Sequence, residues 1–192
     1  MPTGKRPQPL QWVITTITFG PVYDSFAAAN AAATADKVTA RLTFTEALVL
    51  YVNGQNAYIQ DATGAMMLYG TSTLKAGDKI SGYVEGELYL YNGLPELANF
   101  TLNAETVSSD NEVVPTVVDA AALAENPQAF VSQYVQVSPA KFAEDKEVST
   151  VTNVNFTVGE TALILRNNFK VEFSVEAAKE YTVAGIVTIY VK

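Results

Sequence analysis

Residues 51–70 read YVNGQNAYIQDATGAMMLYG, a stretch in which short apolar runs alternate with turn-forming residues. Asn53-Gly54 lies between two of these runs, and this pair is a strong hairpin signal because both residues tolerate positive φ. Asp61-Ala62-Thr63-Gly64 predicts a second turn, in which the Asp61 carboxylate accepts backbone N–H bonds and Gly64 supplies positive φ. The stretch therefore predicts three strands joined by two tight turns.

The strand pattern extends beyond this stretch in both directions. A connector, TSTLKAGD (71–78), follows the third strand, and Asn92-Gly93 predicts a further hairpin turn. Five strands in a meander-like order are therefore expected. They cover residues 38–52, 56–60, 65–69, 79–91 and 94–107.

A polar segment, SSDNEVVP (108–115), follows these strands and is typical of a linker. After it, Thr116 with an acid at Asp119 predicts a helix N-cap, and Pro127 should end that helix. A helical turn is expected at 175–179, after an acidic loop, AEDKE, at 143–147. The four strand candidates of this half are residues 133–142, 151–158, 162–165 and 181–191.

Two segments of the first half carry a resemblance to a known family. Residues 57–65, AYIQDATGA, and residues 74–80, LKAGDKI, resemble a pattern of OB-fold domains in secreted and lipid-anchored bacterial surface proteins. In that pattern YIQDATG is followed by LKxGDxI. The resemblance covers about residues 37–107 and implies a small, partly open barrel of five strands.

The second half is similar to a looser copy of the same domain. Residues 133–137, QYVQV, correspond to its first strand, and residues 181–187, YTVAGIV, correspond to its fourth. Such proteins often carry two of these domains in tandem, and the resemblance also implies a nucleic-acid ligand by analogy. This chain departs from the pattern because it lacks the lipid-anchor cysteine and because its second copy has no fifth strand.

We therefore expect an all-β fold with an extended N-terminal arm and linker at 1–35, an OB-fold domain at 36–112 and an OB-like domain at 113–192. A barrel that lacks its last strand has an open edge, which favours pairing with another strand. We expect the arm of this chain or of a neighbouring chain to supply that strand. The apolar residues of the arm are Trp12, Ile14, Ile17 and Phe19.

The composition limits the chemistry that the chain can carry. Its 192 residues are 48% hydrophobic and 17% charged, which is typical of a β-rich globular protein. It contains no cysteine and no histidine, which excludes disulfides, thiolate and Ser-His chemistry and nearly every zinc site. A D-x-D-x-D-G calcium loop is also lacking. We expect no metal, no cofactor and no enzymatic activity.

Charge and hydropathy limit the partners and the location. The net charge of −8 disfavours nucleic acid and anionic lipid, because the summed field repels phosphate groups. No run approaches the ~20 apolar residues that a membrane span needs. The basic pair Lys5-Arg6 is followed by a stretch that Thr15, Thr16 and Thr18 interrupt, so no clear signal peptide is recognised. A virion or an extracytoplasmic, cell-surface location is favoured.

Residues 80–91 alternate in a way that predicts one inner and one outer strand face. The inner face carries Ile80, Val84, Leu88 and Leu90. The outer face carries Tyr83, Glu85, Glu87, Tyr89 and Tyr91. Aromatic rings beside carboxylates suit a neutral glycan, whereas a nucleic acid would require neighbouring Lys or Arg. The alternative is that these tyrosines cover a partly buried face or pack on another subunit.

Two features that resemble catalytic sites are better explained by structure. Glu85 and Glu87 would lie roughly 6.6 Å apart along a strand, which is near the lower limit for an inverting glycosidase pair but is common in strands. Asp61 lacks the adjacent Thr or Ser, and the second copy, that an aspartic protease needs. It also lacks the following Lys of a phosphorylated-aspartate signature. Arg41 is interpreted as an ordinary solvated residue.

The sequence favours a non-catalytic structural or adhesive assembly subunit, built from OB-fold modules and belonging to a virion or a bacterial surface structure. The arm, the incomplete second barrel and a composition rich in Thr, Ala and Asn motivate this hypothesis. Its partners would be other proteins or further copies of the chain. The alternative is a carbohydrate- or nucleic-acid-binding OB-fold module that uses the outer face of residues 80–91.

Overall fold

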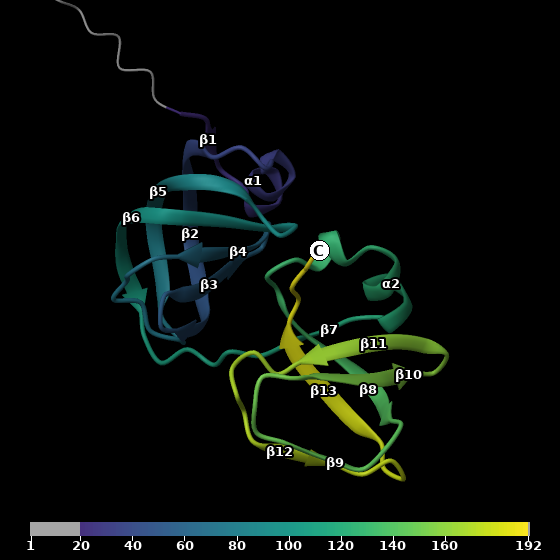
Figure 1. Ribbon diagram of the computed structural model, residues 1–192. Helices are drawn as coiled ribbons and strands as arrows, with labels where there is room; N and C mark the ends of the chain where they lie inside the picture. The colour runs from purple at the N-terminus through teal and green to yellow at the C-terminus, as the bar shows by residue number, and fades with distance from the viewer. Residues whose placement is uncertain (1–19, 192) are drawn as a thin grey trace, which may run out of the picture.

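The computed structural model describes residues 20–191, which are mostly β-structure with two short α-helices (Figure 1). Neither helix of this part of the chain is long and apolar enough to cross a membrane. The arm residues Trp12, Ile14, Ile17 and Phe19 lie outside the described residues, so their role stays a prediction. The all-β expectation agrees with this structure at the level of secondary-structure content.

The strands form two groups. The first strand group comprises β2–β6, and the second strand group comprises β7–β13. The N-terminal elements are β1 (Val22–Tyr23), α1 (Phe26–Ala32), β2 (Val38–Asn53), β3 (Asn56–Asp61), β4 (Gly64–Tyr69), β5 (Lys79–Tyr91) and β6 (Leu94–Ser108). The C-terminal elements are β7 (Thr116–Val117), α2 (Ala120–Glu125), a 3-10 turn (Pro127–Phe130), β8 (Tyr134–Phe142), β9 (Lys146–Val148), β10 (Asn153–Val158), β11 (Thr161–Arg166), β12 (Phe173–Val175) and β13 (Tyr181–Ile186).

The pairings of the first strand group return to the strand from which they begin. β2 pairs with β3, β3 with β4, β4 with β6, β6 with β5, and β5 with β2. Only the β4–β6 pairing among these is parallel. β2 serves two neighbours because residues 38–44 pair with β5 and residues 48–53 with β3, and a bulge at Glu46 (φ 51°) bends the strand between them. The five strands predicted from the sequence are all present, with ends within one residue of expectation.

Both turns predicted within residues 51–70 are also present. Gly54 has φ 61° and Gly64 has φ 144°. Asp61 Oδ1 accepts hydrogen bonds from the Thr63 backbone N–H at 2.7 Å and from the Thr63 hydroxyl at 2.6 Å. The Thr63 hydroxyl oxygen in turn accepts a bond from the Phe26 backbone N–H at 2.9 Å. Asp61 therefore holds the β3–β4 turn and, through Thr63, the start of α1.

Helix α1 contributes to the core of the first strand group. It begins after Ser25, whose hydroxyl accepts a hydrogen bond from the Ala28 backbone N–H at 3.2 Å. Phe26 and Ala29 are buried, and the Phe26 ring lies 6.1 Å from the Phe44 ring on β2. Burial of a side chain such as Phe26 contributes about 1.5–3 kcal/mol. This contact fixes the segment that leads into β2.

In the second strand group β8 is the central strand. β13 and β10 pair antiparallel with β8, and β7 pairs parallel with it. β11 extends the sheet beyond β10, while β9 and β12 form a separate two-stranded sheet. The four predicted strands of this half are present as β8, β10, β11 and β13. Within residues 20–191 no further strand pairs with β11 or β13, which end the main strand path of this sheet; β7 lies off this path and pairs only with β8.

Other predictions for the second half are wrong. Thr116 is not a helix N-cap, because it pairs with Val135 as part of β7; Asp119 caps α2 by accepting a bond from the Ala122 backbone N–H at 2.8 Å. A single turn is present within 175–179, closed by the bond from the Lys179 N–H to the Glu176 carbonyl at 3.1 Å, but Val175 belongs to β12 and the acidic loop contains part of β9. The last strand ends at Ile186 instead of 191. Pro127 ends α2 as predicted, at the start of the 3-10 turn.

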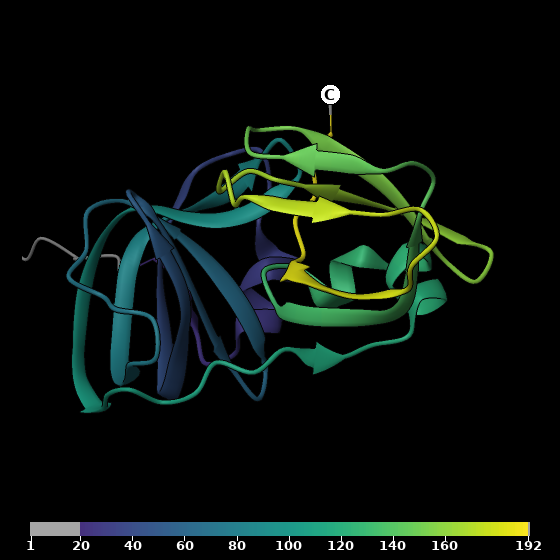
Figure 2. The same cartoon turned by 90° about the horizontal axis from the view of Figure 1, so that it is seen from below.

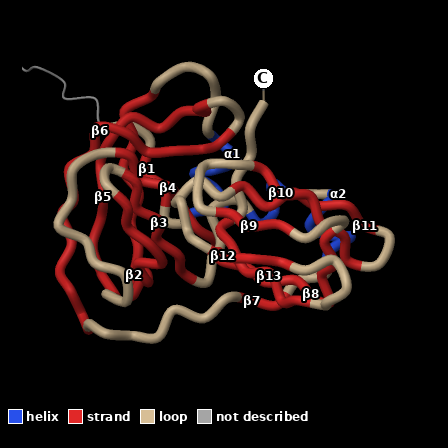
Figure 3. Tube along the Cα trace, turned by 60° about the horizontal axis from the view of Figure 1, so that its bottom comes forward, coloured by secondary structure: helices blue, strands red, loops and turns tan. Residues whose placement is uncertain are grey.

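The two strand groups lie side by side (Figures 2 and 3). Residues of both groups form one apolar cluster. The Tyr51 and Phe169 rings lie 4.4 Å apart between centroids, and Val131 is only 2% exposed. The backbone N–H of Val191 donates to the Asn92 carbonyl at 2.7 Å. The other members of the cluster are Leu48, Leu50, Tyr58, Met67, Leu94, Val113, Tyr134, Ile186 and Ile189.

Replacing Phe169 with alanine should lower the free energy of unfolding by about 1–2 kcal/mol, less than for a fully buried Phe because this ring is half-buried. Urea unfolding at pH 7, followed by circular dichroism, measures the change. Val171→Ala is the matched control, since Val171 is 56% exposed and should change stability by less than about 0.5 kcal/mol. Equal effects of the two substitutions would contradict a role of Phe169 in joining the strand groups.

Candidate functional sites

The outer side of β5 carries the residues that the sequence analysis selected, and we call it the tyrosine face: Tyr83, Glu85, Glu87, Tyr89 and Tyr91. The predicted alternation is present, because Ile80, Val84 and Leu88 on the opposite side of β5 are buried. The first four residues of the tyrosine face are partly exposed and Tyr91 is 56% exposed. β5 therefore brings these side chains together along one surface of the first strand group.

Arg41 on β2 occupies one end of the tyrosine face. It lies opposite Glu85 in the β2–β5 register, and its Nη2 atom is 2.6 Å from Glu85 Oε1. Its guanidinium carbon also lies 4.2 Å from the centre of the Tyr83 ring, which is a cation–π contact. The interpretation of Arg41 as an ordinary solvated residue is wrong, since it binds both a carboxylate and an aromatic ring of this face.

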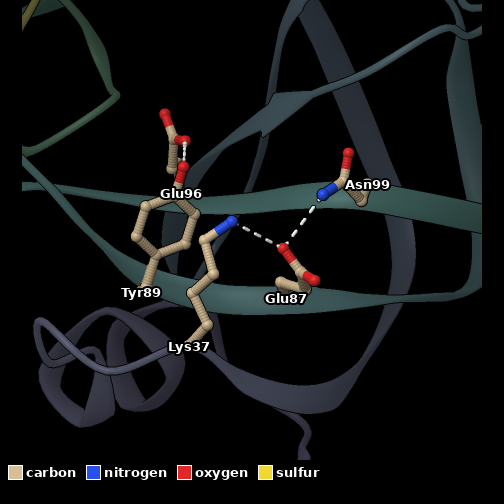
Figure 4. A network of polar contacts seen from close by, with 5 residues as sticks. All are labelled: Lys37, Glu87, Tyr89, Glu96 and Asn99. Atoms are coloured by element: carbon tan, nitrogen blue, oxygen red, sulfur yellow. Dashed lines mark hydrogen bonds and ion pairs between the residues drawn. The ribbon is translucent and has the colours of Figure 1, made fainter.

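Lys37 makes a similar set of contacts at Glu87 and Tyr89 (Figure 4). Lys37 Nζ lies 2.8 Å from Glu87 Oε2 and 4.7 Å from the centre of the Tyr89 ring. The side-chain amide of Asn99 on β6 donates a second hydrogen bond to Glu87 Oε2 at 2.9 Å. The hydrogen bonds from Lys37 and Asn99 lower the pKa of Glu87 below its usual value. Glu87 is therefore an ionised carboxylate with two donors.

Tyr89 also contacts the most deeply buried acid of the site. Its hydroxyl donates to Glu96 Oε1 at 2.5 Å, and Glu96 is only 3% exposed (Figure 4). Burial raises the pKa of Glu96, and the bond from Tyr89 opposes this shift only in part. Burial and the bond to Glu96 also raise the pKa of the Tyr89 hydroxyl. At neutral pH Tyr89 is thus a hydrogen-bond donor and not a base.

The tyrosine face has fewer free ligand-binding groups than its sequence suggests. Glu85 and Glu87, which would accept sugar hydroxyls, already accept bonds from Arg41, Lys37 and Asn99. The bonds from Lys37 and Asn99 lower the pKa of Glu87, which disfavours Glu87 as a general acid. Tyr91 is the member of the face with the most exposed ring. The arrangement is therefore a charge-balanced surface that lies over the β2–β5 and β5–β6 pairings.

Sequence reasoning missed Lys37, Arg41, Glu96 and Asn99 as members of this site. Arg41 belongs to the part of β2 that pairs with β5, and Lys37 directly precedes β2. Glu96 lies opposite Tyr89 in the β5–β6 register. Once that register is known, the Arg41–Glu85 pair follows from the charge pairing of directly opposed residues. The register itself was not available from the sequence of β5 alone.

The Asp61 turn borders a shallow pocket of about 530 Å³, and Asp24, Thr43 and Ser81 also line it. Asp61 Oδ1 is engaged with Thr63, and the chain contains no histidine that could act as its partner base. Within residues 20–191 no cluster of three or more acidic side chains is placed to hold a metal ion. The hydrogen bonds of Asp61 to Thr63 give the turn a structural role.

The second strand group has a different exposed feature, the outer edges of β11 and β13, which we call the open edge. Ile164 on β11 is 64% exposed, and its neighbours Ala162 and Arg166 are exposed as well. On β13, Thr182 and Ala184 are exposed. Unpaired strand edges present backbone donors and acceptors that another strand can bind. The open edge is therefore a candidate protein-binding site.

Known proteins do not identify either site. Comparison with protein-family models finds no match to this chain. Comparison with curated proteins also finds no match. The function is therefore inferred from the geometry of the tyrosine face and the open edge.

Proposed function

We propose that this protein is a non-catalytic assembly subunit built from two OB-like modules, and that it binds other proteins through its open edge. The strand order supports the OB-like assignment of the first module. In an OB-fold, five strands form a partly open barrel, and the β2-β3-β4-β6-β5 pairings, which return to β2, agree with this arrangement. The location in a virion or on a bacterial surface remains part of the proposal.

The observation that carries the proposal is the two unpaired strand edges of the second module, one on β11 and one on β13. β8, β10 and β11 repeat the pairing of β2, β3 and β4, and β13 pairs with β8 as β5 pairs with β2. β6 joins β4 to β5 in the first module, and it has no counterpart in the second module within residues 20–191. A barrel with this gap has two strand edges available to a partner.

The charge-balanced tyrosine face supports the same proposal in a second way. Its carboxylates are bound to Lys37 and Arg41, and the rings of Tyr83 and Tyr89 lie under the same cations. A surface of this kind suits a protein that keeps its outer faces polar while it associates elsewhere. We therefore place the interaction at the open edge and not at the tyrosine face.

Light scattering of the full chain tests the proposal. We expect a mass above that of the 20.6 kDa monomer that rises with concentration, and we expect Ile164→Lys to reduce it, because an edge lysine opposes strand addition. Val117→Lys is the matched control, since Val117 is also exposed, at 70%, but lies on β7. A full chain that stays monomeric at every concentration, or that responds equally to both substitutions, would contradict the proposal.

A further inference from the structure

The inward sides of β11 and β13 are less covered than those of the corresponding strands in the first module. On β4 the core-facing residues Met66 and Leu68 are fully buried, and on β5 Ile80, Val84 and Leu88 are buried. On β11 and β13 every core-facing side chain is only half-buried. These side chains, which pack on the second core, are Leu163, Leu165, Tyr181 and Val183. An apolar element is therefore missing over both strands.

The backbone of β11 is also directed toward this gap. β10 and β11 are joined by a two-residue hairpin, in which Val158 opposes Thr161. In such a hairpin the closing pair is hydrogen-bonded and bonded pairs alternate with non-bonded ones. Leu163 and Leu165 therefore bond to β10, whereas the backbone groups of Ala162, Ile164 and Arg166 point to the outer edge. A strand placed there would find three consecutive sets of donors and acceptors.

The described part of the chain does not fill the gap with a strand. After β13, Val187 bonds to Gln133 beside β8, and Val191 then bonds to Asn92 in the first strand group. The chain thus leaves the second module after β13, at the point where the first module turns from β5 into β6. Helix α2 packs Leu123 against the core of the second strand group, but the groups inside a helix bond to the helix itself and cannot pair with a strand edge.

We infer that residues 12–19 of a second copy of this chain occupy the gap, as a strand parallel to β11 and antiparallel to β13. This inference rests on the proposed assembly function. Residues 12–19 lie outside the described residues and read WVITTITF, a run of β-branched and aromatic residues without Gly or Pro. The direction follows from the first module, where β6 is parallel to β4 and antiparallel to β5.

The donor must be another copy because of where the described chain begins. The Pro21 carbonyl accepts a bond from the Arg41 backbone N–H at 2.9 Å, and Val22 pairs with Arg41, so this segment is fixed on β2. β1, which begins two residues after Gly20, lies on the first strand group and away from β11 and β13 in both labelled views (Figures 1 and 3). Residue 19 is covalently bonded to Gly20, so residues 12–19 of the same chain are attached at the first module, whereas the gap lies in the second module.

Donation from one copy to the next has a geometric consequence. The donating surface and the accepting surface are different parts of the chain, so the contact is heterologous. A heterologous contact forms a ring if the rotation between copies closes and an open filament if it does not. We therefore expect assemblies of many copies, in which each copy completes the second module of its neighbour.

Disulfide cross-linking of the full chain tests this arrangement, and the absence of native cysteine makes each introduced pair unambiguous. Each variant carries one arm cysteine, placed in turn at positions 13–18, and one edge cysteine at Ala162 or Arg166. On mild oxidation we expect a ladder of linked chains on a non-reducing gel. Linking should succeed at every second arm position. A parallel strand also requires the arm positions that link to Ala162→Cys to lie N-terminal to those that link to Arg166→Cys.

A matched control carries the same arm cysteines with Val117→Cys, which is exposed but lies away from the open edge, and should give no ladder. A linked product of monomer mass would overturn donation between copies. A large assembly by light scattering with no cross-link from any arm position would overturn the arm as donor but leave the assembly function standing. A strictly monomeric chain would overturn both.

Discussion

Replacing Gly82 with alanine is expected to lower the free energy of unfolding by about 3–5 kcal/mol, a large part of the about 5–15 kcal/mol that holds a domain folded. Gly82 lies on β5 between β2 and β6, with φ 144°, a backbone conformation that L side chains rarely adopt. An added Cβ would lie 2.3 Å from the Asn103 carbonyl oxygen and 2.7 Å from Ala104 Cα. Both neighbours are backbone atoms of β6, so relief requires the β5–β6 pairing to separate.

Two other glycines separate the causes of this effect. Gly54 has φ 61° but nothing within 4 Å of an added Cβ, so Gly54→Ala should show only the conformational cost, about 1–2 kcal/mol. Gly185 on β13 has open space as well and no positive φ, so Gly185→Ala should be near neutral. Urea unfolding of the three variants at pH 7 should rank Gly82, Gly54 and Gly185 in that order. Equal losses at Gly82 and Gly54 would contradict the contact with β6.

The first strand group was predictable from the sequence because its signals are local. Asn-Gly turns at Asn53-Gly54 and Asn92-Gly93, together with the Asp61 turn, mark where strands end, and each lies within a few residues of the strands it joins. Only their pairing needed the structure. The parallel β4–β6 pairing, for example, joins Met67 to Glu96, which are far apart in the sequence. No local pattern predicts such a contact.

The second strand group was predicted less well for the same reason. β9 and β12 are three residues each, and they exist through the pairing of Phe173 with Val148 and of Val175 with Lys146. Nothing in KEV alone predicts a strand, since strand preference depends on the neighbours that cover it. Thr116 shows a related limit, because a residue that suits a helix N-cap also suits a strand, and pairing with Val135 decided between them.

The tyrosine face was predictable as a face but not as a network. Period-two alternation places Tyr83 and Tyr89 on one side of β5 from the sequence alone. The cations that cover them come from β2 and the segment before it, and Glu96 comes from β6. Glu96 follows Pro95 in an apolar segment, where an acid gives no sign of burial until a partner such as Tyr89 is known. Buried acids usually have hydrogen-bond partners.

Replacing Tyr89 with phenylalanine is expected to lower the free energy of unfolding by about 2 kcal/mol at pH 7, which is typical of a lost hydrogen bond to a buried charged group. The ring and its contact with Lys37 remain, and only the hydroxyl that donates to Glu96 is lost. Urea unfolding over pH 4–8 measures the change. Tyr83→Phe is the matched control. This substitution keeps the ring that contacts Arg41 and should change stability much less.

The pH dependence identifies Glu96 as the cause. Because burial raises the pKa of Glu96 in the folded protein, the folded state binds this proton more tightly than the unfolded state, and this group lowers stability as pH rises through the folded pKa. Tyr89→Phe removes a bond that favours the ionised form of Glu96, so the pKa of Glu96 should rise further. The stability cost of Tyr89→Phe should therefore be small in acid and grow toward neutral pH. Glu96→Gln should abolish this dependence and reduce the added cost of Tyr89→Phe to that of a neutral hydrogen bond, about 1 kcal/mol. A cost of Tyr89→Phe that is the same at every pH, with or without Glu96, would show that the hydroxyl acts elsewhere.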